Sequence, residues 1–77
     1  MTTRSYTVVL IPDAEEGGYT VRVPALPGLT TEGDTLDEAL EMARDAIRLH
    51  IEDLLAEGEP IPEEALPIQT AVVEVAA

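Results

Sequence analysis

Residues 23–47, VPALPGLTTEGDTLDEALEMARDAI, constrain the fold more than any other part of the chain. They pass from the end of a strand through a Pro/Gly turn and a short polar strand into an amphipathic helix. Thr35 and Glu38 have the spacing of a capping box, in which the Thr hydroxyl accepts from the amide of Glu38 and the Glu carboxylate reaches back to the amide of Thr35. The helix start is therefore fixed. The turn over residues 24–28 holds two prolines and a glycine, which do not suit a strand interior.

Two strands are predicted before this stretch. Residues 5–11 are rich in β-branched residues, and residues 19–23 alternate, with Tyr19, Val21 and Val23 on the inward face. The segment between them ends in two glycines, which adopt positive φ readily. The two strands therefore form an antiparallel hairpin, and residues 29–32 add a short polar edge strand.

The helix is predicted over residues 36–57, with Gly58 as its C-terminal cap. Three prolines then interrupt regular structure over residues 59–67, and residues 68–75 predict a final strand with Ala71, Val73 and Val75 on one face. The apolar stripe of the helix consists of Leu36, Leu40, Ala43, Ile47, Ile51 and Leu54, and it is widened by Ala39, Ala46 and Leu55.

These elements define an α+β fold of order β-β-β-α-β. A strand, a helix and a strand in succession normally form a right-handed crossover between parallel strands. With the last strand placed beside the first, we expect a four-stranded mixed sheet of order 3-2-1-4 with the single helix on one face. That arrangement resembles a partial RNase H-like fold.

A set of residues spread over the predicted strands, turns and helix start has an order and spacing typical of one known family: Tyr6, Gly17, Gly18, Tyr19, Pro24, Leu26, Pro27, Gly28, Gly33, Thr35, Glu38, Ala39, Ala43, Ala46 and Ile47. In these residues the chain resembles the HicB family, the antitoxins of HicA–HicB toxin–antitoxin modules. The resemblance covers residues 6–60 and implies the same RNase H-like fold. It departs from the family at Leu29, where members usually have Cys, and we expect a short form that lacks the C-terminal DNA-binding domain of many members.

Length and composition bound the remaining possibilities. A chain of 77 residues forms one domain, residues 1–77, whose core is small enough that we expect a homodimer or tetramer. Without Cys there is neither a thiolate metal site nor a Cys nucleophile. The longest apolar run, residues 8–11, is far below the ~18 residues of a membrane span, and no signal peptide is seen, so we expect a cytoplasmic protein.

The net charge is −12, from sixteen acidic residues against four Arg and no Lys. The four Arg are scattered, so no basic stripe exists to displace phosphate counterions, and direct nucleic-acid binding by this chain alone is not expected. The charge favours either encounter with a basic protein or simply a solvated surface.

No catalytic constellation is recognisable. Two-metal nucleases of the RNase H type need converging carboxylates, yet the first predicted strand has no acid, and Glu41 and Glu74 lack a third partner. His50 has no nucleophile at a recognisable spacing, and with Asp53 it would form an incomplete ligand set; a packed histidine is the alternative. We therefore expect no enzymatic activity, no metal and no cofactor.

The resemblance implies that the chain binds and occludes a small basic HicA-type mRNA ribonuclease. For the contact surface we expect Glu15 and Glu16 as a negative rim, with Tyr19 and Leu26 as anchors. Alternatively, Leu26 folds back over the helix start and belongs to the core. A different function, an orphan ligand-binding or structural module with no toxin partner, also remains open.

Overall fold

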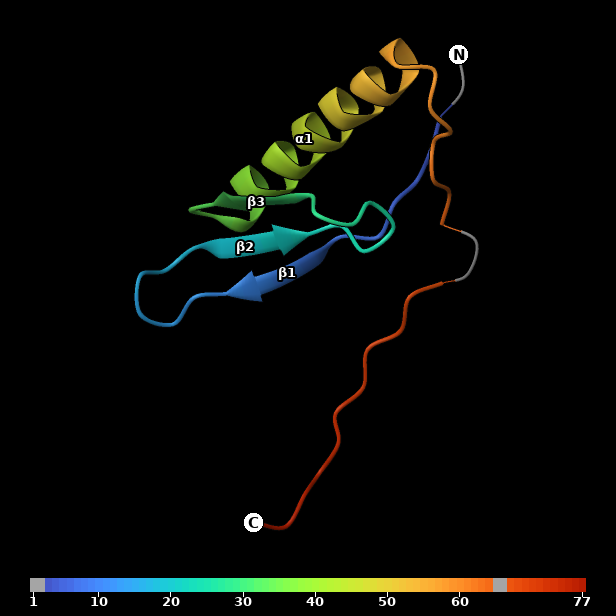
Figure 1. Cartoon of the computed structure of the whole chain (residues 1–77). Helices are drawn as coiled ribbons and strands as arrows, with labels where there is room; N and C mark the ends of the chain where they lie inside the picture. Colours follow the sequence, from blue (N-terminus) through green and yellow to red (C-terminus); the bar gives the residue numbers. More distant parts are fainter. Residues whose placement is uncertain (1–2, 65–66) are drawn as a thin grey trace.

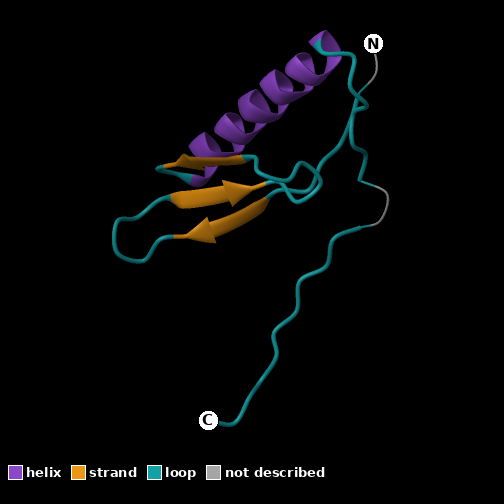
Figure 2. Ribbon diagram, viewed as in Figure 1, coloured by secondary structure: helices purple, strands orange, loops and turns teal. Residues whose placement is uncertain are grey.

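A computed structural model describes residues 3–64 and 67–77 of the chain. Three short strands are followed by one long helix: β1 (Val9–Pro12), β2 (Tyr19–Arg22), β3 (Thr30–Gly33) and α1 (Leu36–Ala56). The strands form an antiparallel sheet of order β1-β2-β3, and α1 lies across one face of it (Figure 1). Residues 67–77 are extended and run away from the sheet (Figure 2).

The hairpin between β1 and β2 is confirmed, although β1 is shorter than expected. Its register pairs Val9 with Arg22 and Pro12 with Tyr19. Extended towards the N-terminus, this register would pair Val8 with Val23 and Thr7 with Pro24. The amide of Val23 instead donates to the carbonyl of Leu29 at 3.4 Å, and Pro24 has no N–H to donate. The ladder therefore stops where the Pro/Gly turn begins.

The helix start is also confirmed, with one change in the cap. The Oγ1 of Thr35 accepts from the amide of Glu38 at 3.1 Å. The carboxylate of Glu38 accepts from the amide of Asp34 at 3.3 Å, one residue earlier than a regular capping box would have it. At the other end, Glu57 caps the helix, and Gly58 reverses the chain with a φ of 70°.

The core lies where α1 crosses β2 and β3. Val21, Ala39 and Ala43 are buried together, with Val8, Leu10 and Tyr19 packed against them. The helix therefore approaches the sheet through its two alanines, whereas Leu36 and Leu40 of the predicted stripe are 47% and 38% exposed. Small side chains at the crossing allow the backbones of α1 and β3 to come close.

The predicted four-stranded sheet of order 3-2-1-4 is wrong, and the RNase H-like arrangement based on it is not seen. Residues 67–77 form no strand, and Val72 is 94% exposed. After the helix, Pro62 and Glu64 do reach the chain ahead of β1, but through side-chain hydrogen bonds: Tyr6 donates to the carbonyl of Pro62, and Thr7 to the carboxylate of Glu64. Prolines have no N–H for a ladder, so this contact does not continue as a strand.

Candidate functional site

Asp13 organises the turn that carries Glu15 and Glu16. Its backbone closes the β1–β2 loop, donating to the carbonyl of Gly18 and accepting from the amide of Gly17, both at 3.0 Å. Its Oδ1 accepts from the amides of Glu15 and Glu16 at 2.9 and 3.1 Å. The amide of Glu16, and then that of Glu15, hold the pKa of Asp13 below its ordinary value. The backbone that presents both glutamates is thus fixed.

A depression of about 160 Å³ lies beside this turn and is lined by several acidic residues. Its lining includes Asp13 and Glu16 from the turn, Tyr19 from β2, and Glu32 and Asp34 from the β3 end. We call this surface, together with the adjacent Glu15, the acidic end of the sheet. Two of the predicted residues, Glu16 and Tyr19, therefore lie together.

Sequence reasoning missed Glu32 and Asp34. They reach the acidic end because β2 pairs with β3 in a register that sets Thr20 opposite Glu32 and Tyr19 opposite Gly33. Pairing the two predicted strands through their shared turn would have brought them to the same edge. Four carboxylates from two segments, the β1–β2 turn and the end of β3, thus lie close together.

Leu26 lies elsewhere and is fully buried. It is held inside the turn between β2 and β3, where its amide donates to the carbonyl of Val23 at 2.9 Å and its carbonyl accepts from Leu29 at 3.1 Å. This turn lies at the Arg22 end of β2, whereas the acidic end of the sheet lies at the Tyr19 end of the same strand. Of the two alternatives for Leu26, the structure shows the core position, and no projecting anchor is formed by this side chain.

The remaining candidates for chemistry do not converge. Glu74 lies in the extended tail and Glu41 on the exposed face of α1, and His50 is half-buried. Among the residues that the structure describes, no three His, Cys, Asp or Glu side chains are grouped so as to hold a metal ion. Within residues 3–64 and 67–77, no helix has the length and apolar character needed to cross a membrane.

Glu64 has a structural role that its sequence context did not reveal. Its two carboxylate oxygens accept from the amide and from the hydroxyl of Thr7, each at 2.7 Å. The hydroxyl of Thr7, and then its amide, lower the pKa of Glu64 from the ordinary value of 4.5. This Glu64 clamp fastens the chain after α1 to the segment ahead of β1.

Glu64→Gln is expected to loosen this clamp while the sheet and helix stay folded. Removing the charge weakens both hydrogen bonds, so amide exchange at Thr7 should become about threefold to tenfold faster. Nuclear magnetic resonance of hydrogen exchange measures this rate directly. Glu63→Gln is the matched control, because Glu63 is exposed and forms no side-chain hydrogen bond within the described residues; an equal effect of the two variants would contradict the clamp.

Acid should open the same clamp in the unmodified protein. Because the pKa of Glu64 is lower in the folded state, the stabilisation is complete above about pH 4.5 and is lost as the pH falls through the folded-state value. The protection factor of the Thr7 amide, corrected for the intrinsic pH dependence of exchange, should therefore fall over that interval.

Comparisons with known proteins agree on one family. Residues 6–75 match the model of the HicB-like antitoxin of bacterial toxin–antitoxin systems. A UPF0150 protein of Synechocystis sp. is 42% identical over 65 residues, which cover 84% of this chain and 81% of that protein. A UPF0150 protein of Thermoplasma acidophilum is 49% identical over 59 residues, covering 77% of this chain and 84% of that protein.

Named antitoxins are similar over a smaller share of their own length. Antitoxin HicB 1 of Photorhabdus laumondii is 49% identical over 57 residues, which are 74% of this chain and 36% of that antitoxin. Antitoxin HicB of Escherichia coli K12 is 40% identical over 57 residues, 41% of its length. Since the family match extends over nearly the whole sequence and includes both the sheet and the helix, the chain belongs to the HicB-like antitoxin family of bacterial toxin–antitoxin systems.

Proposed function

We propose that this chain is an antitoxin that binds a small basic HicA-type ribonuclease and covers its RNA-cleaving surface. Family membership supports a regulatory, non-catalytic role and a toxin partner. The observation that carries the proposal further is the acidic end of the sheet, where Asp13, Glu16, Glu32 and Asp34 line one depression. A basic surface is the complement that these carboxylates favour.

The geometry of the acidic end suits recognition of a protein rather than of a small cation. Tyr19 contributes a half-buried aromatic ring beside the carboxylates, and the described residues include no group of three His, Cys, Asp or Glu side chains that could hold a metal ion. Tyrosine is enriched at interfaces because its ring supplies apolar contact area and its hydroxyl a hydrogen bond. The turn that carries Glu15 and Glu16 is already held by Asp13, so little conformational freedom is lost on binding.

The proposal is tested by mixing the purified chain with a HicA-type toxin. We expect a complex on size-exclusion chromatography, weaker binding at higher salt, and loss of the toxin's RNA cleavage. No complex at micromolar concentration and low salt would instead favour the alternative of a module without a toxin partner, as would a gene with no neighbouring reading frame for a small basic protein.

The contribution of the acidic end is measured by neutralising its exposed tip. Glu15→Gln combined with Glu16→Gln should weaken toxin binding by about tenfold, mainly through slower association. Glu57→Gln combined with Glu59→Gln is the matched control, since it removes the same charge at the far end of α1. Calorimetry gives the affinities and stopped-flow the rates. Equal weakening by both pairs would mean that net charge, and not this surface, directs binding.

A further inference from the structure

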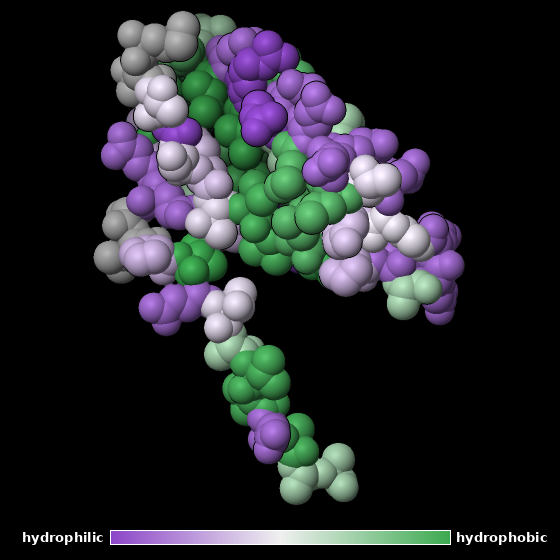
Figure 3. Space-filling view, turned by 180° about the vertical axis from the view of Figure 1, so that it is seen from behind, coloured by the Kyte–Doolittle hydropathy of each residue, from purple (hydrophilic) through white to green (hydrophobic). Residues whose placement is uncertain are grey.

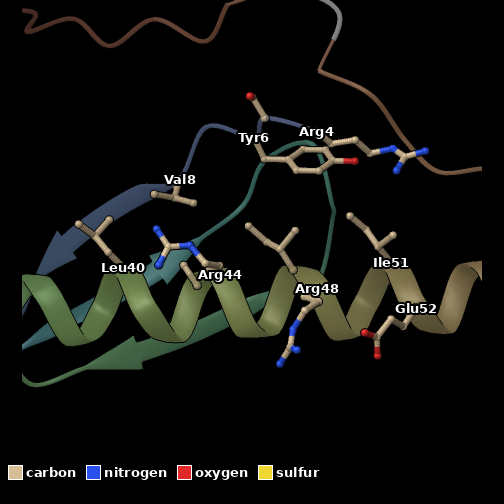
Figure 4. A pocket seen from close by; sticks show the side chains of 11 residues that line it. Arg4, Tyr6, Val8, Leu40, Arg44, Arg48, Ile51 and Glu52 are labelled. Carbon is tan, nitrogen blue, oxygen red and sulfur yellow. The ribbon is translucent and has the colours of Figure 1, made fainter. Parts of the chain in front are cut away.

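An apolar groove of about 580 Å³ runs between α1 and the segment ahead of β1. Tyr6 and Val8 form one wall, and Leu40, Ile47 and Ile51 form the floor along the helix. In Figure 3, apolar side chains gather on the main body and again towards the end of the tail. The close view in Figure 4 shows Ile51 directed towards the ring of Tyr6, with Arg4 on the same wall as Tyr6.

The groove exists because the helix is longer than the sheet that it covers. The 21 residues of α1 span about 31 Å, whereas strands of four residues span about 13 Å. The first half of α1 is packed on β2 and β3 through Ala39 and Ala43. Its second half extends past the sheet, and there Ile47 and Ile51 are only half-buried. The helix therefore has an apolar face without a strand beneath it.

The tail, residues 67–77, exposes apolar side chains that no other part of the described chain covers. It is extended and β-like in composition, yet Val72, Val73 and Val75 are 94%, 79% and 83% exposed. Figure 1 shows the tail leaving the body and ending far from it. Its alternation places Val73 and Val75 on one side and Glu74 on the other. Contiguous exposed apolar residues of this kind mark interaction segments.

We propose that the tail of one copy of this chain occupies the helix groove of a second copy, and that the exchange is reciprocal. Length and chemistry both fit. From Leu40 to Ile51 the helix rises about 17 Å, which an extended segment of about five residues covers, matching 71–75. Val73 and Val75 lie against the apolar floor, and Glu74 then lies on the outer side of the tail, away from the floor.

The Arg side chains of the groove favour an acidic partner, and a second copy of this chain is acidic, with a net charge of −12. Three of the four Arg line the groove. The guanidinium of Arg48 lies 3.6 Å from the carboxylate of Asp45, while the structure has no salt bridge for Arg4 or Arg44 within residues 3–64 and 67–77. An apolar segment that belongs to a second acidic chain complements such a groove.

A second copy would cover both the exposed groove and the exposed tail. The chain's own tail, residues 67–77, lies away from the body (Figure 1), and none of the described residues that line the groove lies beyond Glu52. Reciprocal exchange closes with twofold symmetry and leaves neither a groove nor a tail uncovered. It also adds buried apolar surface to a chain near the lower size limit for a self-sufficient core.

The test uses the full chain, which has no Cys of its own. Ile51→Cys and Val73→Cys are combined in one chain and oxidised mildly. We expect a covalent dimer on a non-reducing gel, with mass spectrometry of peptides placing the disulfide between positions 51 and 73 of different chains. A disulfide within one chain, or none between these positions, would overturn the proposal.

A second measurement avoids changing the groove. Val73→Asp should raise the dimer dissociation constant in analytical ultracentrifugation by about a hundredfold, because the exchanged site occurs twice in each dimer. Val72→Asp adds the same charge on the opposite side of the tail and should change it little. Both positions are exposed in the single chain, so neither variant threatens its fold. A monomeric parent protein, or equal effects of the two variants, would count against exchange.

Discussion

Gly33→Ala is expected to lower the free energy of unfolding by about 3 kcal/mol, although it adds a single methyl group. Gly33 ends β3 at the point where α1 crosses the sheet. A Cβ at this position would meet the amide nitrogen of Ala39 and lie 2.6 Å from its Cα and 2.9 Å from the carbonyl carbon of Glu38. These are backbone atoms of the first turn of the helix, so no side chain can rotate away to make room. The helix would have to move off its buried contacts.

Chemical denaturation followed by circular dichroism measures this loss. Gly58→Ala is the informative control, because Gly58 has a φ of 70° but nothing within 4 Å of an added Cβ. It should cost about 1 kcal/mol from backbone conformation alone. If Gly33→Ala cost no more than Gly58→Ala, the close approach of helix and strand would not limit the packing of this fold.

Local patterns in the sequence were sufficient to predict the hairpin and the helix. Alternation fixed the inward face of β2, where Val21 is fully buried. Thr35 fixed the helix start because its hydroxyl has one well-placed amide to accept from, that of Glu38. Each of these signals acts within a few residues, where the physics of capping and of alternating faces decides the outcome almost alone.

The final strand could not be decided in this way. Residues 68–75 have the composition of a strand, but a strand exists only where another backbone offers a ladder. Whether a ladder is available depends on the path of the chain after α1. The Glu64 clamp fixes part of that path through a hydrogen bond between the side chains of Thr7 and Glu64, which are 57 positions apart in sequence. The predicted apolar face of the helix includes both core alanines, but periodicity alone does not say which of its members are buried: the close approach at Gly33 selects Ala39 and Ala43 for the core.

The candidate site was predicted in part for the same physical reason. Glu16 and Tyr19 are close in sequence and flank one turn, so their proximity follows from the hairpin. Glu32 and Asp34 join them only through the register of β2 with β3. For Leu26 the sequence left two alternatives open, an exposed anchor and a core residue. A leucine between two prolines in a turn looks exposed by context, yet the backbone hydrogen bonds of that turn direct it inward.

Leu26→Asp is therefore expected to abolish the folded state at neutral pH. Removing a fully buried Leu side chain costs about 3 kcal/mol, and placing an unpaired carboxylate there costs more. A domain of this size has only about 5 kcal/mol to lose. Far-UV circular dichroism should show the loss of α1 together with the sheet. Leu49→Asp is the control: Leu49 is 55% exposed on α1, and the same change there should leave the chain folded.

Because Leu26→Asp is expected to be unfolded, the role of this side chain in binding is tested with Leu26→Ala instead. It should lower the free energy of unfolding by about 3 kcal/mol and still give a measurable unfolding transition at low temperature. Under conditions where the variant is folded, its affinity for the proposed toxin partner should equal that of the parent protein, because a side chain enclosed in the β2–β3 turn has no surface to offer a partner. Reduced affinity at full folding would instead show that the turn opens on binding and that Leu26 then acts as the anchor.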